Sequence, residues 1–391
     1  MEEFLELIKQ HRKSLIADRR DFHMYPEVGY KEFRTSRIIS EKLKGLNIDV
    51  EVGVGQTGVV GLLTGEKVGP TVLLRFDMDA LPIKEENTVE YVSQNNGVMH
   101  ACGHDGHVAI GLCIARIFAP LSHKLKGTIK FVFQPAEEGG AGASAMIEDG
   151  VLLDPVPDYA YGMHLWNEKP VGWLGITDGA MMAGNSNWEC DVIGDGGHAA
   201  TPHHLNDPII TASQIVGSLQ TVVARNISPI ESVVMSVAQI HGGDTNNVIP
   251  NRVRLSGTLR YFNDELCVLV QNRMTTIVKN IAESMGCSAN IRFVPGYKPV
   301  VNDAKHARLI RQIASETSIV DFVSDDIQTT VSEDFSEFLH QISGSYFFVG
   351  SANSELGLDY PHHHSRFDID ESALTVGVSV MSSIVSHHLL D

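Results

Sequence analysis

The pattern of apolar and polar positions predicts an α/β domain over the first half of the chain. An amphipathic helix ends near Phe22, and a second helix is expected over 31–43. A run of strands and one further helix follows, with strands at 48–52, 58–63, 71–76 and 128–133 and the helix at 105–119. The third strand holds the uninterrupted apolar run Val72-Leu73-Leu74, which is typical of a strand covered on both faces.

The pattern changes near residue 185. Strand, helix, strand, strand, helix and strand are expected at 188–193, 208–226, 232–240, 252–262, 264–285 and 289–293. This βαββαβ order is that of a ferredoxin-like α+β domain with both helices on one face of its sheet. We therefore expect an inserted domain over 184–294 and a discontinuous main domain over 1–183 and 295–391. A chain of 391 residues is long enough for two cores.

The stretch Val98–His107 gathers three histidines, a cysteine and an aspartate at the start of the expected helix over 105–119. Cys and His side chains hold zinc-like divalent ions, and Asp can ligate an ion or orient a ligating imidazole. Cys102 and His104 are two residues apart, so both can point the same way in an extended or turn backbone. The stretch predicts a metal site where a strand gives way to a helix. The alternative is a polar turn capped by Asp105.

Paired acidic residues follow two of the expected strands. Asp77 and Asp79 share a face if the extended backbone continues, and they could ligate an ion, orient a ligand or cap a turn. Glu137 and Glu138 are adjacent, so their side chains point in different directions, and one can bind metal while the other moves a proton. A solvated acidic loop is the alternative for this second pair.

One histidine interrupts a later apolar strand. His164 lies within Tyr159–Trp166, and a lone histidine there is more often a core or edge residue than a ligand. His164 becomes a candidate ligand because the other strand ends that carry polar residues are expected to meet at the same edge of the sheet.

The composition of the chain limits the classes of partner that the protein is expected to bind. The chain carries 30 Lys and Arg against 48 Asp and Glu, a net charge of −18, which argues against nucleic acid or an anionic membrane as a partner. No apolar run reaches the length of about 18 residues that a membrane span needs. Five scattered cysteines favour a reducing compartment, so a cytoplasmic location is expected.

Ten phrases, in order along the chain, resemble the two-domain, two-metal family of aminoacylases and zinc carboxypeptidases. They are His23–Gly29, Asp77–Pro82, Met99–His107, Gln134–Gly140, Gly162–Trp166, Gly196–His203, Asn247–Pro250, Gly257–Arg260, Ser332–Phe335 and His364–Glu371. The branch that the chain is most similar to contains hippurate hydrolases, auxin-conjugate amidohydrolases and N-acetyl-diaminopimelate deacetylases. The resemblance implies an α/β, mixed-sheet, zinc-peptidase-like catalytic domain with a ferredoxin-like lid or dimerisation domain inserted, and self-association as a homodimer or higher homo-oligomer.

The resemblance also implies roles for individual residues. The implied metal ligands are Cys102, His104, Glu138, His164 and His364. Glu137 is the implied general base, and His198 resembles the histidine that the inserted domain offers to the substrate carbonyl. Asn247 and Arg260 resemble groups that meet the substrate carboxylate, and Asp77 and Asp79 are expected to support the ligands from behind.

Two departures from the family pattern bear on these assignments. Phe76 stands where the family usually has Ala, which could alter pocket packing without touching a ligand. His363-His364-Ser365 stands in place of a Leu-His-Ser phrase, so His362 or His363 could take the place of His364 as the last ligand.

The donor set, together with the family resemblance, predicts a reaction. Five ligands suffice for two divalent ions if Cys102 bridges them, and zinc, manganese, cobalt and nickel all suit these donors. We expect metal-dependent hydrolysis of the amide bond of small-molecule N-acyl amino acids, with carboxypeptidase or dipeptidase activity at the same site as the alternative. A metal-binding scaffold without catalysis, and a cysteine nucleophile at Cys102, are further alternatives.

Overall fold

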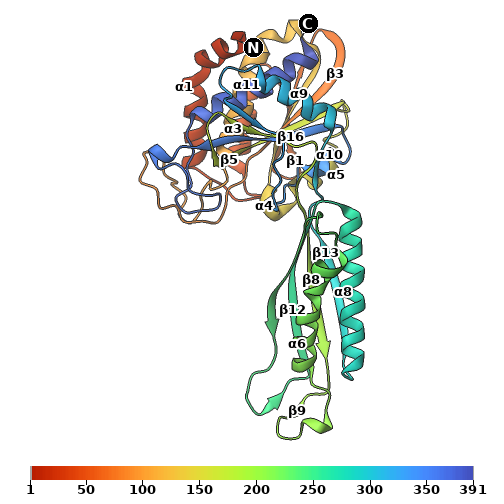
Figure 1. Ribbon diagram of the computed structural model, residues 1–391. Helices are drawn as coiled ribbons and strands as arrows, with labels where there is room; N and C mark the ends of the chain where they lie inside the picture. Colours follow the sequence, from red (N-terminus) through yellow and green to blue (C-terminus); the bar gives the residue numbers. More distant parts are fainter. Residues whose placement is uncertain (1, 391) are drawn as a thin grey trace. The chain divides into compact units, whose positions relative to one another are not determined.

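The structure is a computed structural model that describes residues 2–390. The chain divides into two compact units (Figure 1). Unit 1 comprises Met1–Met181, Val301–Ile327 and Asp334–Asp391, and unit 2 comprises Met182–Val300 and Gln328–Glu333. The insert therefore begins two residues before the expected boundary at 184, ends six residues after 294, and is joined by a short later segment.

Unit 1 is built on an eight-stranded mixed sheet. Its strands lie in the order β1 (Asp49–Val54), β2 (Gly58–Thr64), β4 (Lys126–Gln134), β3 (Lys67–Asp77), β5 (Tyr159–Pro170), β16 (Gly344–Ala352), β6 (Trp173–Gly175) and β15 (Phe322–Ser324). The central strands β4, β3, β5 and β16 are parallel, β1 and β2 pair antiparallel to their neighbours, and β6 is antiparallel to β16 and parallel to β15. The predicted α/β class with a mixed sheet is confirmed.

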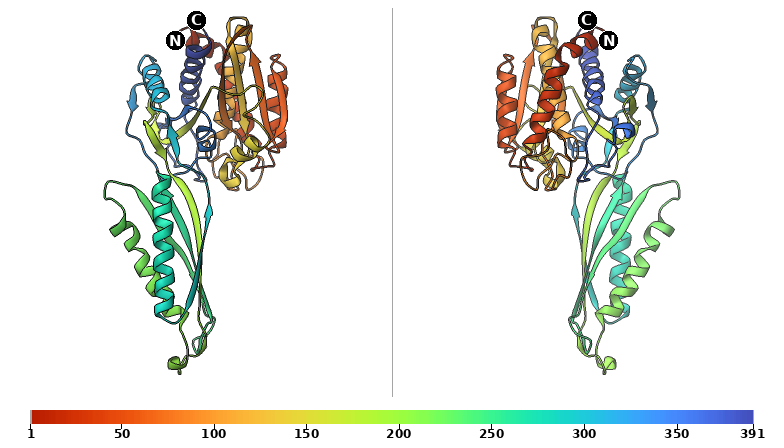
Figure 2. Two further views of the ribbon diagram at one scale, coloured as in Figure 1. Left: turned by 90° about the vertical axis from the view of Figure 1, so that its right-hand side faces the viewer. Right: turned by 90° about the vertical axis from the view of Figure 1, so that its left-hand side faces the viewer.

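Helices pack on this sheet and on one another. The longer ones are α1 (Glu2–Met24), α2 (Phe33–Lys44), α3 (His104–Phe118), α9 (Ala304–Ser315) and α11 (Ser372–Leu389). Short helices are α4 (Glu137–Gly140), α5 (Gly142–Glu148) and α10 (Ser336–Leu339), with 3-10 turns at Ala119–Lys124 and Ser354–Leu356. A two-stranded ribbon pairs β7 (Gly179–Met182) with β14 (Val300–Asn302). α1, α3 and α11 contact each other, as Figures 1 and 2 show.

Helix α3 lies directly on the sheet. A Cβ atom added at Gly111 would stand 2.6 Å from the Phe76 ring and 2.9 Å from the Phe133 ring, so only glycine permits this approach. Phe76 is buried and packs on Phe133 with ring centroids 5.5 Å apart. The departure at Phe76 thus fills the core beneath α3. Among the described residues, His104–Lys124 is the stretch long and apolar enough to cross a membrane, but most of it is buried in this core.

Unit 2 has the predicted βαββαβ order. Its four-stranded antiparallel sheet runs β10 (Val233–His241), β12 (Arg252–Tyr261), β8 (Gly184–Ile193) and β13 (Ser288–Pro295). Helices α6 (Pro208–Leu219), α7 (Thr221–Asn226) and α8 (Asp264–Ser284) cover one face, so the single helix expected over 208–226 is divided at Gln220 (Figure 2). A small ribbon pairs β9 (Gly197–His198) with β11 (Val248–Ile249), next to the 3-10 turn Pro202–His204. The core of this unit centres on the buried Trp188.

Candidate metal centre

Four chain segments bring polar side chains to the carboxyl ends of the central strands of unit 1. Asp77 is the last residue of β3, and the chain that follows it carries Cys102 and His104 to the start of α3. Asp77 pairs in register with Gln134, the last residue of β4, which leads to Glu137. His164 lies within β5, and the fourth segment, 360–371, follows β16. Ligand sites of parallel sheets form at this edge, because the carboxyl ends of the strands meet there.

Backbone conformations that side chains rarely adopt occur in these segments. Gly103 precedes α3 with φ 87°, and Ala136 precedes Glu137 with φ 51°. His363 has φ 65°. Non-glycine residues at positive φ persist only where their surroundings hold them, and they concentrate at functional sites.

The donors that these segments carry lie together. The ligand atoms of Cys102, His104 and His164 all lie within 4.8 Å of one another, as do those of the set His104, Glu137 and Glu138. A third set joins Cys102 and Glu138 to His363. Four of the five expected ligands, Cys102, His104, Glu138 and His164, therefore belong to one cluster, with Glu137 beside it.

Hydrogen bonds decide which nitrogen of each histidine can face an ion. The Nδ1 atom of His104 lies 2.9 Å from the backbone oxygen of Asp79 and 3.2 Å from its carboxylate, so it donates there. The other ring nitrogen, Nε2, is buried and has no hydrogen-bond partner among the described residues. His164 donates from Nδ1 to the Leu165 carbonyl at 2.8 Å, and its Nε2 lies 3.5 Å from the Cys102 sulfur. Each ring therefore uses Nδ1 on a protein acceptor and leaves Nε2 as the atom that can face an ion, as metal-bound imidazoles do.

His107 stands in the same region but both of its nitrogens are occupied. Nδ1 lies 2.5 Å from a carboxylate oxygen of Asp77, and Nε2 accepts the backbone N–H of Leu165 at 3.0 Å. Arg75 binds the other oxygen of Asp77 at 2.6 Å. Asp77 therefore joins Arg75 and His107 in a buried polar network beside the expected ligands. The sequence reading did not single out His107 or Arg75, although both lie within quoted or adjacent phrases.

Asp79 supports two of the ligands at once. Besides His104, its carboxylate accepts the backbone N–H of Glu138 at 3.0 Å. Asp77 and Asp79 thus contact residues of this region, and their role in supporting the ligands stays a prediction. The Glu pair diverges as adjacent residues should: Glu137 is buried, whereas a carboxylate oxygen of Glu138 lies 3.0 Å from Nε2 of His363.

The three consecutive histidines have different surroundings. His364 is not part of the cluster: its ring stacks on Tyr360 with centroids 4.6 Å apart, and its Nδ1 accepts the backbone N–H of Arg366. His363 faces Glu138 and Cys102 instead. The structure therefore places His363, and not His364, at the cluster. The left-handed backbone at residue 363 turns this ring toward the cluster, which spacing alone does not reveal.

The electrostatics of the cluster call for a cation. Burial, reinforced by the carboxylates of Glu138 and Glu137, raises the pKa of the Cys102 thiol well above its usual range. Burial lowers the pKa of His104, but the charge of Asp77 and the hydrogen bond to Asp79 raise it to about 10. A bound divalent ion reverses both trends, because it favours a thiolate and a neutral imidazole.

The donor set fits metal ions. Thiolate, imidazole and carboxylate are the ligands of zinc and similar transition metals. The buried Nε2 of His104 has no hydrogen-bond partner among the described residues, and the Asp77 carboxylate lies 3.7 Å from it. Five donors suffice for two ions when one donor is shared, and Cys102, His104 and Glu138 each belong to more than one of the donor sets.

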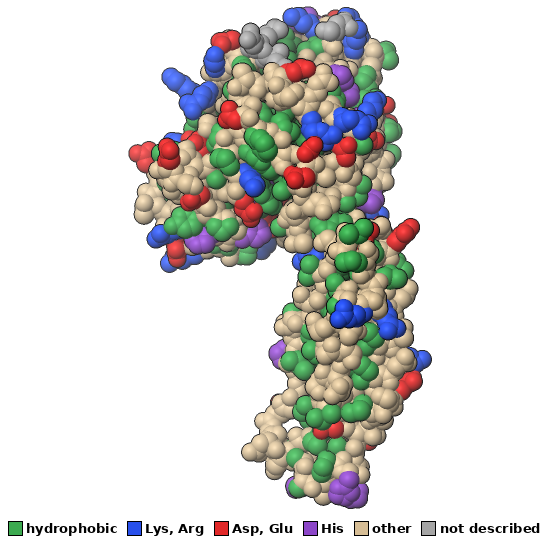
Figure 3. Space-filling view, in the orientation of Figure 1, with side chains coloured by type: hydrophobic (Ala, Val, Ile, Leu, Met, Phe, Trp, Pro, Cys, Tyr) green, Lys and Arg blue, Asp and Glu red, His purple; other side chains and the backbone are tan. Residues whose placement is uncertain are grey.

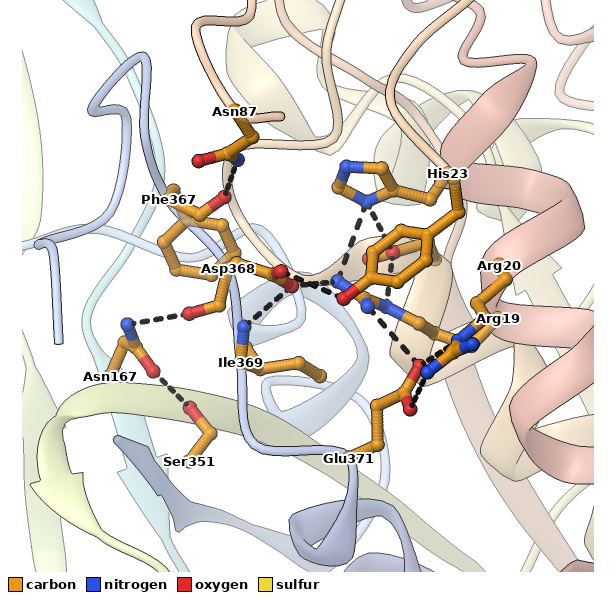
Figure 4. A network of polar contacts seen from close by, with 12 residues as sticks. Arg19, Arg20, His23, Asn87, Asn167, Ser351, Phe367, Asp368, Ile369 and Glu371 are labelled. Atoms are coloured by element: carbon orange, nitrogen blue, oxygen red, sulfur yellow. Dashed lines mark hydrogen bonds and ion pairs between the residues drawn. The ribbon is translucent and has the colours of Figure 1, made fainter. Parts of the chain in front are cut away.

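A buried charge network supports the cluster from the side of α1 (Figure 4). Arg19 is fully buried and donates to Asp105, the residue after His104, at 2.8 Å, and to Asp368 at 2.5 Å. His23 binds the same oxygen of Asp105 at 2.8 Å. The side chain of Asn167 donates to the carbonyl oxygens of Tyr360 and Asp368, which lie on either side of His363 in the sequence. None of these network roles followed from the sequence.

Unit 2 holds the remaining expected site residues. His198 is exposed on β9, and its Nδ1 accepts the backbone N–H of Ala200 at 3.0 Å. Asn247 is exposed and accepts a hydrogen bond from Thr245. Arg260 is half-buried on β12 and donates to Thr258 and to the Leu259 carbonyl, and burial lowers its pKa. These three residues belong to a different unit from the metal donors.

Residues 73–387 match the family model described as peptidase family M20/M25/M40. The chain is 40% identical over 362 residues to the N-acetyl-L-cysteine deacetylase of Bacillus subtilis, a match covering 93% of this chain and 85% of that protein. It is 38% identical over 367 residues to thermostable carboxypeptidase 1 of Saccharolobus solfataricus, covering 93% and 92%. The crystal structure of Bacillus subtilis YxeP, described as a dinuclear metal binding peptidase, is similar with a TM-score of 0.85 and 31% identity, covering 96% of this chain and 98% of that one.

Proposed function

The chain belongs to peptidase family M20/M25/M40, a family of metal-dependent hydrolases, and on that premise we propose that it hydrolyses the amide bond of N-acyl amino acids. The products are a free amino acid and a carboxylic acid. The observation that carries the proposal is the convergence of Cys102, His104 and His164 beside the buried carboxyl group of Glu137. A relative named as a deacetylase of an N-acyl amino acid supports the substrate class.

The proposed metal ligands are Cys102, His104, Glu138, His164 and His363. When bound, two divalent ions supply charge that lowers the pKa of water from 15.7 towards about 7 and polarises a carbonyl group. Glu137 takes the proton from the attacking water and delivers it to the nitrogen of the leaving amine. The position of Glu137 supports this role. Its carboxylate lies within 4.8 Å of ligand atoms of His104 and Glu138, and Glu137 directly precedes the proposed ligand Glu138.

Residues of unit 2 are proposed to meet the substrate. Because Nδ1 of His198 accepts a backbone N–H, the neutral ring carries its proton on Nε2 and can donate it to the carbonyl oxygen as negative charge develops there. Arg260 suits the substrate carboxylate because a guanidinium stays charged and pairs with both oxygens. Asn247 adds a neutral donor for the same carboxylate.

The test is a substrate panel. Chelated enzyme is reloaded with zinc, manganese, cobalt or nickel and assayed on N-acetyl and N-benzoyl amino acids against dipeptides. The proposal expects turnover of N-acyl amino acids well above that of dipeptides. The reverse preference would favour the second candidate, a carboxypeptidase or dipeptidase, which the 38% identity to a thermostable carboxypeptidase supports.

Two further proposals concern the cell. We propose a cytoplasmic location, supported by five free cysteines in the described chain.

We also propose a homodimer formed through unit 2. Ile193, Ile240 and Val294 are exposed apolar residues of its strands, and hydrophobic side chains are spread along the visible face (Figure 3). Light scattering that returned only a 42.7 kDa monomer at micromolar concentration would contradict the dimer.

A further inference from the structure

His362 lies at the cluster without an assigned role. Its ring is packed among three others, with centroid distances of 5.1 Å to His164, to Trp166 and to Phe367. Nδ1 of His362 lies 3.9 Å from the sulfur of Cys102. A second imidazole beside a bridging sulfur is either a ligand or a hydrogen-bond donor to it, and these two roles require different protonation of Nδ1.

The hydrogen bond on the other nitrogen decides between them. The backbone N–H of Asn167 points at Nε2 of His362 across 3.2 Å. An N–H can bond only to a nitrogen that keeps its lone pair, so Nε2 carries no proton. This excludes the doubly protonated ring as well as the tautomer protonated at Nε2. The proton therefore sits on Nδ1, the atom that faces Cys102.

The backbone that makes this bond is held in place. The side chain of Asn167 donates to the carbonyl oxygens of Tyr360 and Asp368 at 2.8 and 3.0 Å, and its oxygen accepts the hydroxyl of Ser351 at 3.0 Å (Figure 4). Asn167 and Asp368 are both buried. The side chain of Asn167 thereby fixes the strand that bears His164 to the segment that bears His362 at two points and to β16 at a third. The ring of His362 cannot turn its Nε2 toward the sulfur without breaking the bond to the Asn167 backbone.

We propose that His362 is a positioning residue that donates a hydrogen bond from Nδ1 to the Cys102 sulfur and is not itself a metal ligand. A donor on a thiolate withdraws electron density from the sulfur, and such outer contacts tune both the affinity and the electronic character of a bound metal. The three histidines then have three different roles: His362 adjusts the sulfur, His363 ligates, and His364 stacks on Tyr360 outside the cluster. The inference rests on the metal centre of the proposed function.

Cobalt gives a direct readout, because thiolate-to-cobalt charge transfer absorbs light at an energy set by the sulfur. The full-length wild type, H362F and H362Q are loaded with Co²⁺, and the cobalt content and absorption spectrum of each are measured. Phe keeps a ring but removes the donor, whereas Gln keeps an N–H donor but removes the ring. H362L is a second donor-free variant should H362F fail to fold, and H364L is the matched control from the same triplet.

The inference expects H362F to retain the cobalt content of the wild type and to shift the charge-transfer band to longer wavelength, because a sulfur without its donor is easier to oxidise. H362Q should return the band toward the wild-type position, and H364L should leave it unchanged. An unshifted band in H362F and H362L, or the loss of one cobalt equivalent, would overturn the inference while the metal centre stands. A wild type without any thiolate-to-cobalt band would overturn the metal centre itself and this inference with it.

Discussion

The Nε atom of Arg19 donates to the carboxylate of Asp105 across 2.8 Å and so joins helix α1 to the first turn of helix α3, at the residue that follows His104. Both side chains are fully buried. The guanidinium also reaches Asp368, which stands five residues after His363, so one side chain joins two segments that lie far apart in the sequence and contain His104 and His363. The metal donors can therefore be arranged before any ion binds.

Replacing Arg19 by Met should destabilise the protein strongly. The change leaves the buried carboxylates of Asp105 and Asp368 without their cation, and loss of one partner of a buried pair typically costs about 3–5 kcal/mol. Urea unfolding of the metal-free protein measures this loss in the free energy of unfolding. The control is Arg37→Met, which removes an exposed pair with Glu41 and should cost less than about 0.5 kcal/mol. Equal losses in the two variants would show that the buried network does not stabilise the fold.

The same network predicts a pH-dependent stability. Burial and the charge of Arg19 lower the pKa of His23, but its bonds to Asp105 and Glu85 raise it to about 9. Since the unfolded value is about 6.5, the protonated ring stabilises the fold fully below pH 6.5 and this contribution is lost as pH rises through about 9. The free energy of unfolding should fall by roughly 3 kcal/mol across that window.

The control for that measurement is His23→Gln, assayed without metal. This variant should lack the decline attributed to the imidazole, although its stability at neutral pH should be lower. A decline of the same size in wild type and variant would assign the pH dependence to other groups.

Glu137→Gln should abolish turnover and keep the metal. The amide cannot accept a proton, and loss of a general base typically lowers the rate by about 10²- to 10⁴-fold. Metal content measured by mass spectrometry should equal that of the wild type, because the proposed ligand is the neighbouring Glu138. Glu138→Gln is the matched control and should lose metal. Turnover unchanged in Glu137→Gln would remove the general-base role.

Chelation separates a metallohydrolase from a cysteine nucleophile. Treatment with EDTA should remove activity, and a divalent ion added back should restore it. A cysteine nucleophile at Cys102 would act without metal, so activity that survives complete metal removal would contradict the metal-dependent mechanism. A scaffold without catalysis would show metal binding and no turnover under any of these conditions.

Some features of this arrangement could be predicted from the sequence, and others could not. The spacing of Cys102 and His104, and the acidic pairs that follow buried strands, were sufficient to indicate the cluster, because parallel strands bring their carboxyl ends to one edge. The βαββαβ insert followed from periodicity alone. Which of three adjacent histidines lies at the cluster could not be predicted, because the choice depends on the left-handed backbone of His363 and on what surrounds each ring.

Buried polar networks were the other part that the sequence left hidden. Arg19 and His107 look like ordinary polar residues of helices, and only tertiary contacts reveal that Arg19 faces Asp105 and that His107 uses both nitrogens within the protein. Periodicity reports which face of a helix is buried, but it does not report which charges are buried together.

Anomalous diffraction from crystals of the protein grown with Mn²⁺ or Co²⁺ would locate the ions and their ligands. We predict two metal peaks bridged by the Cys102 sulfur, with His104, His164, Glu138 and His363 as the other protein ligands and Glu137 not bound to either ion. A single peak, a peak elsewhere in the chain, or two peaks ligated without Cys102 would contradict it.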